Sequence, residues 1–298
     1  MTSIKQVVLI TGASSGFGRL MAEDLAQHNY RVFAAMRNAN GKNAGVAQEL
    51  RELARRESLD LQVVELDVAA PESAERCAAE VIQSAGQIDV LVNNAGIGFV
   101  GLTESYTDEQ AHRIFETNFF GVFRLARAVL PHMLKRHRGL LVQVSSGAGR
   151  IVLPGMGLYC ASKFALEALS EALRYELASS GVDSVSVQPG AYPTGIQSKL
   201  EVGEDTSRNA AYGAAQEMPG IVDALIKKSR ADPQDVAEAV RKIIETSAGT
   251  REAHYRIGKG ASGVEILNEA AAKVQSELLE LFGVAELAKF RSGEAATA

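Results

Sequence analysis

The sequence is poor in cysteine and aromatic residues and contains no tryptophan. Its two cysteines, Cys77 and Cys160, are too few for a disulfide framework, and neither lies in a CxxC motif or a Cys/His cluster. The five histidines show no HExxH or other ligand-like pairing, so we predict no metal site. Low cysteine usage of this kind is typical of the reducing cytoplasm, which is where we expect the protein to be found.

Long apolar runs and an excess of positive charge are also absent. No stretch reaches the roughly 18 consecutive apolar residues of a membrane span, and a strand-like pattern that begins near residue 7 leaves no room for a signal peptide. With 31 Lys and Arg against 36 Asp and Glu, the net charge of −5 excludes a generally basic nucleic-acid-binding protein. We therefore expect neither a membrane nor a nucleic acid among its partners.

What the sequence does contain is a regular alternation of short apolar runs with amphipathic helical runs. The candidate strands are residues 7–10, 31–36, 61–66, 88–92, 139–144, 182–188 and 254–257. Helical patterns cover residues 17–27, 44–56, 71–84, 108–136, 159–179 and 233–246. Most strand runs are continuously apolar, as expected for parallel strands covered on both faces. The alternation predicts an α/β fold: a single Rossmann-type doubly wound parallel sheet of about seven strands with helices on both faces.

We expect residues 1–298 to form one dinucleotide-binding Rossmann domain with two additions. The segment from about 189 to 231 is too long for an ordinary connection and is predicted to be a substrate lid. The segment from about 261 to 298 is predicted to be a C-terminal helical extension.

A glycine-rich turn, TGASSGFG at 11–18, follows the first predicted strand and opens the first predicted helix. Glycines at such a turn let the backbone approach a pyrophosphate, and the helix N-terminus favours its negative charge. A glycine cluster alone also fits an ordinary tight turn, but the position between strand and helix favours the phosphate site. We therefore predict that six residues of this turn bind the coenzyme: Gly12, Ser14, Ser15, Gly16, Phe17 and Gly18.

The end of the second predicted strand indicates which coenzyme is bound. Sites that select NAD carry an acidic side chain there, which binds the ribose 2′-hydroxyl. This sequence has Arg37 instead, and no Asp or Glu between residues 31 and 48. A guanidinium suits a 2′-phosphate through paired, charge-assisted hydrogen bonds, whereas the alternative is a solvated surface arginine. We predict NADP(H), with Arg37 contacting the 2′-phosphate.

Several polar groups are predicted to meet at the carboxyl edge of the sheet. Tyr159 and Lys163 are four residues apart at the start of a helix, so both side chains lie on one face. A Ser-Ser pair at 145–146 ends the fifth strand, and NNAG at 93–96 ends the fourth. Asn118 lies in the middle of a helical pattern, where asparagine is unfavourable unless its amide has a purpose.

With these motifs the chain resembles the classical short-chain dehydrogenase/reductase family over about residues 7–257. The matching motifs are TGASSGFG, NNAG and YCASK, the last at 159–163, and the run 159–177 looks most like the hydroxysteroid and retinol dehydrogenase branch. Ser146 lies thirteen residues before Tyr159 and Asn118 forty-one before it, which are spacings similar to those of the family. This spacing selects Ser146 over Ser145.

The resemblance implies an NADP(H)-dependent oxidoreductase, a carbonyl reductase or alcohol dehydrogenase, with a Ser-Tyr-Lys mechanism. Tyr159 would be the general acid and base, with its pKa lowered by a nearby ammonium, and Ser146 would hydrogen-bond the substrate oxygen. Lys163 would hold the nicotinamide ribose, and Asn118 would anchor a water that passes protons onward. The family pattern adds these residues to the coenzyme site: Asp67, Val68, Asn94, Ala95, Gly96, Tyr159, Lys163, Pro189, Gly190 and Thr194.

The segments expected around the nicotinamide are apolar, with Arg150 as the main charge. Their apolar side chains are Ile97, Phe99, Val100, Leu102, Ile151, Val152, Leu153, Met156, Leu158 and Tyr192. They predict a small hydrophobic carbonyl or alcohol substrate, unless some of them simply pack the core.

Two other functions fit the same fold: an NADP-sensing regulatory protein without catalysis, and an epimerase or dehydratase. The intact Ser-Tyr-Lys set argues against the first, and the limited length of the lid argues against the second. Helices 108–136 and 159–179 carry apolar residues over much of their circumference, so we predict a homodimer or homotetramer.

Overall fold

The computed structural model describes residues 5–194, 200–258 and 262–291. Four parts of the sequence expectations lie outside these residues. They are the N-terminal residues 1–4, part of the predicted lid at 195–199, the junction at 259–261 and the end of the predicted extension at 292–298.

Seven parallel strands form the central sheet, in the order β3-β2-β1-β4-β6-β7-β9. The strands are β1 Val7–Thr11, β2 Arg31–Met36, β3 Leu61–Glu65, β4 Val90–Asn93, β6 Gly139–Val144, β7 Val182–Pro189 and β9 His254–Ile257. Val8 of β1 is in register with Val32 of β2 on one side and Val90 of β4 on the other. The strand order reverses at this point, and ligands of open α/β sheets bind beyond the carboxyl ends of such strands. The predicted fold class is confirmed.

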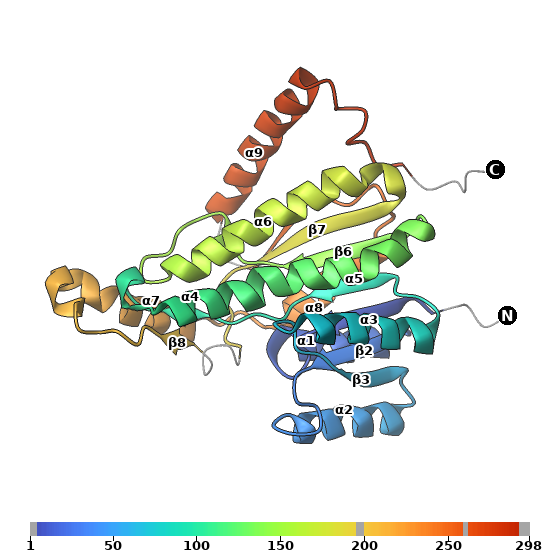
Figure 1. Cartoon of the computed structure of the whole chain (residues 1–298), viewed down its shortest axis with the longest axis horizontal. Helices are drawn as coiled ribbons and strands as arrows, with labels where there is room; N and C mark the ends of the chain where they lie inside the picture. Colours follow the sequence, from blue (N-terminus) through green and yellow to red (C-terminus); the bar gives the residue numbers. More distant parts are fainter. Residues whose placement is uncertain (1–4, 195–199, 259–261, 292–298) are drawn as a thin grey trace.

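Helices cover both faces of the sheet (Figure 1). One face packs against α1 Gly16–Gln27, α2 Ala44–Glu57 and α8 Gln234–Glu245, and the other against α3 Pro71–Ala85, α5 Gly121–Lys135 and α6 Gly157–Leu177. Along β1, Val8 and Ile10 belong to the first core, whereas Val7 and Leu9 belong to the second. Because both faces are covered, this strand is apolar at each position from Val7 to Ile10 rather than at alternate ones.

The helix predicted over 108–136 is present, but its hydrogen-bonding pattern changes partway along it. It consists of α4 Asp108–Phe115, a π-helical turn at Glu116–Phe120, and α5. Asn118 lies within the π-helical turn. Single π-helical turns inside longer helices are frequent at functional sites.

A second, two-stranded sheet was not predicted. Its strands are β5 Phe99–Val100 and β8 Glu201–Val202, which pair in parallel. The predicted lid contains β8, a 3₁₀ segment at Asn209–Glu217 and α7 Met218–Lys227. In Figure 1, β8 and α7 lie together at the end of the molecule where α4 begins. Strands of two residues are too short to leave a periodic pattern in the sequence. Shorter 3₁₀ turns occur at Thr103–Ser105, Gly147–Gly149 and Ala178–Ser180.

The C-terminal extension is helical, as predicted. Helix α9 covers Ser262–Leu281 and extends away from the body beyond α6 in Figure 1. Val264 near its start is buried, and the amide of Arg291, after the helix, donates to the carbonyl of Ala178. Within residues 5–194, 200–258 and 262–291, no helix has the length and apolar character needed to cross a membrane.

Candidate active site

The glycine-rich turn packs tightly against the end of β4. Gly12 has φ +71° and Gly16 has φ +55°, backbone conformations that favour glycine. A Cβ atom on Gly12 would lie 2.8 Å from Cα of Ala95. A Cβ atom on Gly18 would lie 2.5 Å from the carbonyl oxygen of Gly12 and would overlap Nδ2 of Asn94. Glycine is therefore required at these positions by the backbone and by its neighbours.

A small hydrogen-bond network joins this turn to the NNAG segment. The hydroxyl oxygen of Thr11 accepts from the backbone amides of Asn94 and Ala95, both at 2.9 Å. In return, Nδ2 of Asn94 donates to the carbonyl oxygen of Thr11 at 2.9 Å. The carboxyl ends of β1 and β4 are thus held together beside the N-terminus of α1, which is a favourable place for a pyrophosphate.

The segment after β7 lies close to the same turn. The amide of Gly190 donates to the carbonyl of Ile257, and a Cβ atom on Gly16 would lie 3.6 Å from Cβ of Thr194. Tyr192 packs edge-on against Phe17, with ring centroids 5.4 Å apart. The prediction that Tyr192 lines the substrate pocket is therefore wrong, because its ring is buried against Phe17 of the glycine-rich turn.

The loop that carries Arg37 is held by an acidic residue that the sequence did not single out. The carboxylate of Glu65, at the end of β3, accepts from the backbone amides of Asn38 at 2.6 Å and Ala39 at 2.7 Å. Nδ2 of Asn43 donates to the carbonyl of Arg37 at 2.6 Å. The Arg37 side chain is exposed at the carboxyl edge of the sheet. Glu65 lies 27 residues from Asn38 and 26 from Ala39 in the sequence, so only the parallel pairing of β2 with β3 reveals these contacts.

Asp67 and Val68 follow β3 at the same edge. Oδ1 of Asp67 accepts from the amide of Ala69 at 3.0 Å, which closes a tight turn. Val68 packs against the first residue of α5, since a Cβ atom on Gly121 would lie 2.8 Å from Cβ of Val68. Both residues thus border the same edge of the sheet as the Arg37 loop.

Helix α6 brings Tyr159 and Lys163 to the end of β6, as predicted. The Ser146 hydroxyl hydrogen-bonds that of Tyr159. Nζ of Lys163 donates to the carbonyl of Val144 at 3.0 Å and lies 6.0 Å from the centroid of the Tyr159 ring. The hydroxyl of Ser145 is buried and faces Gly149 instead. A Cβ atom on Gly149 would lie 3.0 Å from this hydroxyl oxygen.

Burial is the largest influence on the pKa values of Tyr159 and Lys163, the two candidate catalytic residues on α6. It raises the pKa of Tyr159, and the hydrogen bond from Ser146 opposes that shift. Burial also lowers the pKa of Lys163 to about 8, against the opposing charge of Glu167. The expectation of a lowered Tyr159 pKa is therefore not met in the protein alone, because desolvation of the phenolate outweighs the neighbouring groups.

Asn118 is fully buried and uses its whole amide. Its Oδ1 accepts from the amide of Ile97 at 2.9 Å, and its Nδ2 donates to the carbonyl of Ile97 and to Oγ of Ser162, both at 3.0 Å. Ser162 in turn donates to the carbonyl of Tyr159 at 2.8 Å. The widened π-helical turn therefore connects the segment after β4 with the first turn of α6.

An apolar cluster adjoins Tyr159. Its buried members are Val100, Ala148, Met156 and Cys160, and the partly buried residues packed against it are Leu153, Tyr159, Leu200, Val222 and Ile226. Two of these, Val222 and Ile226, come from α7 of the predicted lid. The predicted lid segment thus contributes to the apolar surroundings of the candidate catalytic tyrosine.

Other predicted pocket residues have different roles. Phe99 is fully buried and packs edge-on against Tyr106, whereas the side chain of Val152 is mostly exposed. Arg150 is not a free pocket charge, because it donates to Oε1 of Glu171 at 3.0 Å and to Oδ1 of Asn268 at 2.8 Å. These contacts direct its guanidinium toward α6 and α9.

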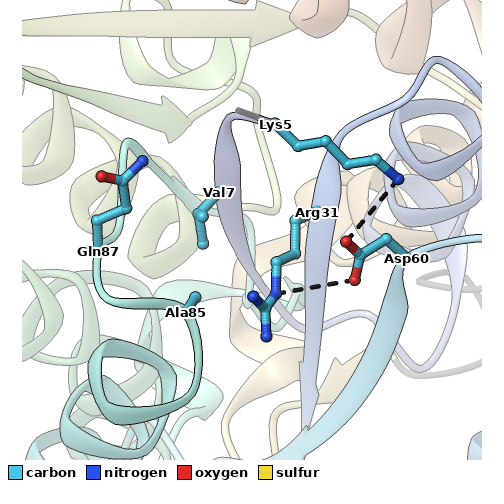
Figure 2. A pocket seen from close by; sticks show the side chains of 6 residues that line it. All are labelled: Lys5, Val7, Arg31, Asp60, Ala85 and Gln87. Carbon is cyan, nitrogen blue, oxygen red and sulfur yellow. Dashed lines mark ion pairs between the residues drawn. The ribbon is translucent and has the colours of Figure 1, made fainter. Parts of the chain in front are cut away.

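A hollow of about 230 Å³ lies at the opposite edge of the sheet (Figure 2). Its lining includes Lys5, Arg31 and Asp60, with Nζ of Lys5 and Nε of Arg31 at 3.8 and 3.7 Å from the Asp60 carboxylate. These residues are at the amino ends of β1, β2 and β3, so the hollow is remote from Tyr159 and the glycine-rich turn.

Comparison with known proteins finds relatives over most of the chain. The short chain dehydrogenase family profile matches residues 6–205. A 3-ketodihydrosphingosine reductase from Bacteroides thetaiotaomicron is 34% identical over 241 residues, which are 80% of this chain and 83% of the relative. Retinol dehydrogenase 8 from Homo sapiens is 36% identical over 267 residues, covering 83% of this chain and 80% of that protein. Among solved structures, a short-chain dehydrogenase from Streptomyces avermitilis matches with a TM-score of 0.75 and 32% identity, covering 95% of this chain and 98% of that one.

Proposed function

The chain belongs to the short-chain dehydrogenase family, and we propose that it is an NADP(H)-dependent oxidoreductase that interconverts a secondary alcohol and a ketone or other carbonyl on a hydrophobic substrate. The proposal rests on one arrangement. Ser146, Tyr159 and Lys163 meet at the carboxyl edge of the sheet, near the turn whose glycines leave room for a pyrophosphate.

The chemistry follows from the groups present. When bound, NADP(H) supplies or accepts the hydride. Tyr159 donates its proton to the oxygen of a carbonyl that is being reduced, and its phenolate accepts the proton of an alcohol that is being oxidised. Because burial raises the pKa of Tyr159, the protonated form needed for reduction is favoured near neutral pH. Ser146 hydrogen-bonds the substrate oxygen while negative charge develops on it.

The residues fit a coenzyme with a 2′-phosphate. The Arg37 guanidinium is exposed where that phosphate is expected, and the nearby Glu65 carboxylate is occupied by two backbone amides. Arg37 therefore offers a positive charge with paired donors at a site where NAD-selective proteins have a free carboxylate.

The surroundings of Tyr159 favour an apolar substrate. Met156, Val222 and Ile226 belong to the cluster that adjoins the tyrosine, and Arg150 is paired elsewhere. A polyhydroxylated or phosphorylated substrate would lose its hydration with few fixed polar partners in return. Two relatives are named for lipid-like substrates: a 3-ketodihydrosphingosine reductase and a retinol dehydrogenase. Their names also support an apolar substrate for this protein.

We also infer a cytoplasmic homodimer or homotetramer. Phe120 in the π-helical turn, Phe123 on α5 and Phe164 on α6 are each about two-fifths exposed. Large aromatic side chains on neighbouring helix surfaces are suited to contact between subunits. The cytoplasmic location rests on the low cysteine content.

The experiment that tests the function compares wild type with Tyr159→Phe. The expected result is nearly unchanged NADPH binding, measured by coenzyme fluorescence, and turnover that falls about 10²–10⁴-fold, the usual contribution of a general acid or base. Turnover is followed by NADPH absorbance with a hydrophobic cyclic ketone and with a phosphorylated ketone of similar size. Normal turnover by the Phe variant would contradict the role of Tyr159, and preference for the phosphorylated ketone would contradict the apolar pocket. NADPH binding without turnover of any carbonyl would instead indicate a sensor.

A further inference from the structure

A buried carboxylate that the proposed mechanism does not use lies one helical turn beyond Lys163. Glu167 on α6 is 1% exposed, which is unusual for a glutamate. Its oxygens are fully engaged: Oε1 accepts from Oγ of Ser186 at 2.7 Å, and Oε2 accepts from Nε2 of Gln188 at 2.9 Å. Burying a carboxylate is costly unless its oxygens are hydrogen-bonded, and this site supplies a donor for each of them.

A wider network holds this carboxylate in place. Nε2 of His254 on β9 lies 3.5 Å from Oε2 of Glu167 and 3.0 Å from Oε1 of Glu171. Oε1 of Gln188 accepts from Nδ2 of Asn268 at 2.8 Å, which ties the network to α9. The network therefore spans α6, β7, β9 and the C-terminal extension.

Glu167, Glu171 and His254 also have ligand-type atoms within 4.8 Å of one another. A metal is not needed to explain the cluster, because Ser186 and Gln188 donate to Glu167, and Arg150 forms an ion pair with Glu171. The charges already have partners.

The helix geometry brings Glu167 near Lys163. Residues four apart on a helix are neighbours, with Cβ atoms roughly 5–6 Å apart. Lys163 is buried, and Glu167 is the carboxylate whose charge opposes the effect of that burial. Gly149 lets this part of α6 pack closely against the loop after β6, since a Cβ atom on Gly149 would lie 2.8 Å from Cγ of Glu167 and 3.0 Å from the backbone carbonyl oxygen of Lys163.

The other polar and titratable groups around Lys163 are either uncharged or paired with residues other than Lys163. Tyr159 on the same helix is neutral when protonated, and Asn118 and Ser146 carry no charge. On β9, His254 contacts Glu167 rather than Lys163, and in the loop after β6 Arg150 is paired with Glu171. Arg256 on β9 is paired with Glu265 on α9.

We propose that Glu167 is a positioning residue: its buried negative charge keeps the Lys163 ammonium protonated beside Tyr159. The inference rests on the proposed function, because a charged Lys163 matters to the Ser-Tyr-Lys chemistry. Without Glu167, burial would favour neutral Lys163 at physiological pH, and the ammonium that stabilises the Tyr159 phenolate would be lost.

The direct test is the titration of Lys163 in the protein without coenzyme. The side chains are labelled with ¹³C at Cε of lysine, and the Lys163 signal is identified by its loss in Lys163→Arg. In wild type this signal should titrate near pH 8. In Glu167→Gln it should titrate about one pH unit lower or more, the shift expected when an opposite charge at this separation is removed. Glu167→Asp, which retains the charge, should restore most of the wild-type value.

Glu171→Gln is the matched control, because Glu171 lies one further turn along α6 and pairs with Arg150 and His254. It should leave the Lys163 titration unchanged. Glu167→Met provides a second uncharged variant that needs no hydrogen-bond partner. An unshifted Lys163 signal in the uncharged variants, an equal shift in Glu171→Gln, or failure of both uncharged variants to fold would each overturn the proposal.

Activity gives an independent second measurement. In Glu167→Gln the alkaline limb of the pH profile for carbonyl reduction should move to lower pH together with the Lys163 titration. A shifted Lys163 signal in a protein that reduces no carbonyl would refute the proposed function while leaving the Glu167 interaction intact. Carbonyl reduction with an unshifted Lys163 signal would instead support the proposed function and refute the Glu167 interaction.

Discussion

Replacing Gly18 with alanine tests whether packing explains the glycine-rich turn. The added Cβ would lie 2.5 Å from the carbonyl oxygen of Gly12 and would overlap Nδ2 of Asn94. The first neighbour is backbone, and the second is held by its hydrogen bond to Thr11. Neither can move without disturbing the connection between β1 and β4, so the cost should appear in both stability and coenzyme binding.

The magnitude follows from two opposing effects. Forcing an extra carbon into a well-packed site costs typically about 1–3 kcal/mol. Alanine in a helix is favoured over glycine by up to about 1 kcal/mol, and Gly18 is the third residue of α1. The steric effect should win, leaving a net destabilisation of about 1–2 kcal/mol. Displacement of Asn94 and Gly12 should weaken NADPH binding about tenfold, which corresponds to about 1.4 kcal/mol.

The matched control is Gly45→Ala near the start of α2, where a Cβ atom would have nothing within 4 Å. There only the helix preference acts, so this variant should gain about 0.5–1 kcal/mol. The free energies of unfolding are measured by urea titration, and NADPH binding by coenzyme fluorescence. If Gly18→Ala were as stable as Gly45→Ala and bound NADPH normally, the packing explanation of the turn would be refuted.

Three further predictions concern separate parts of the molecule. Arg37→Ala should weaken NADP binding by roughly 1.5–3 kcal/mol, the value of a hydrogen bond to a charged group, and leave NAD binding almost unchanged; equal loss for both in calorimetry would contradict contact with the 2′-phosphate. Asn118→Ala should lower the free energy of unfolding by about 1–3 kcal/mol, because the partly buried amide and carbonyl of Ile97 lose their partners; a stable variant in urea titration would argue against this. Phe123→Glu should reduce the mass found by light scattering relative to wild type, and a monomeric wild type at micromolar concentration would contradict the predicted oligomer.

The central sheet was predictable because its determinants are local. The central strands β1 and β4 are apolar up to their last residue, and the residues that follow them carry turn-forming glycines and asparagines. Parallel strands bring their carboxyl ends to one edge, so the meeting of Ser146 with Tyr159 could be inferred without coordinates.

Features that depend on contacts between distant segments could not be predicted in this way. The π-helical turn around Asn118 has an ordinary helical pattern, and its reason, the two hydrogen bonds to Ile97, comes from another segment. Arg150 was assigned to the substrate pocket because its segment was, but its partners Glu171 and Asn268 lie 21 and 118 residues away. A position in the sequence places a residue near a site without giving the direction of its side chain.

Helix α6 shows how local spacing and distant contacts combine in one element. Tyr159, Lys163 and Glu167 recur at four-residue intervals, so a single helix face presents a phenol, an ammonium and a carboxylate in a row. The spacing explains why they are neighbours, but their surroundings come from other segments: Ser146 lies at one end of the row, and the hydrogen-bond donors of β7 lie at the other. The first two residues of the row can be recognised from the motif YCASK, whereas the partners of the third, Ser186 and Gln188, come from β7. The chemistry of the site therefore depends on the sheet behind α6 as much as on the helix itself.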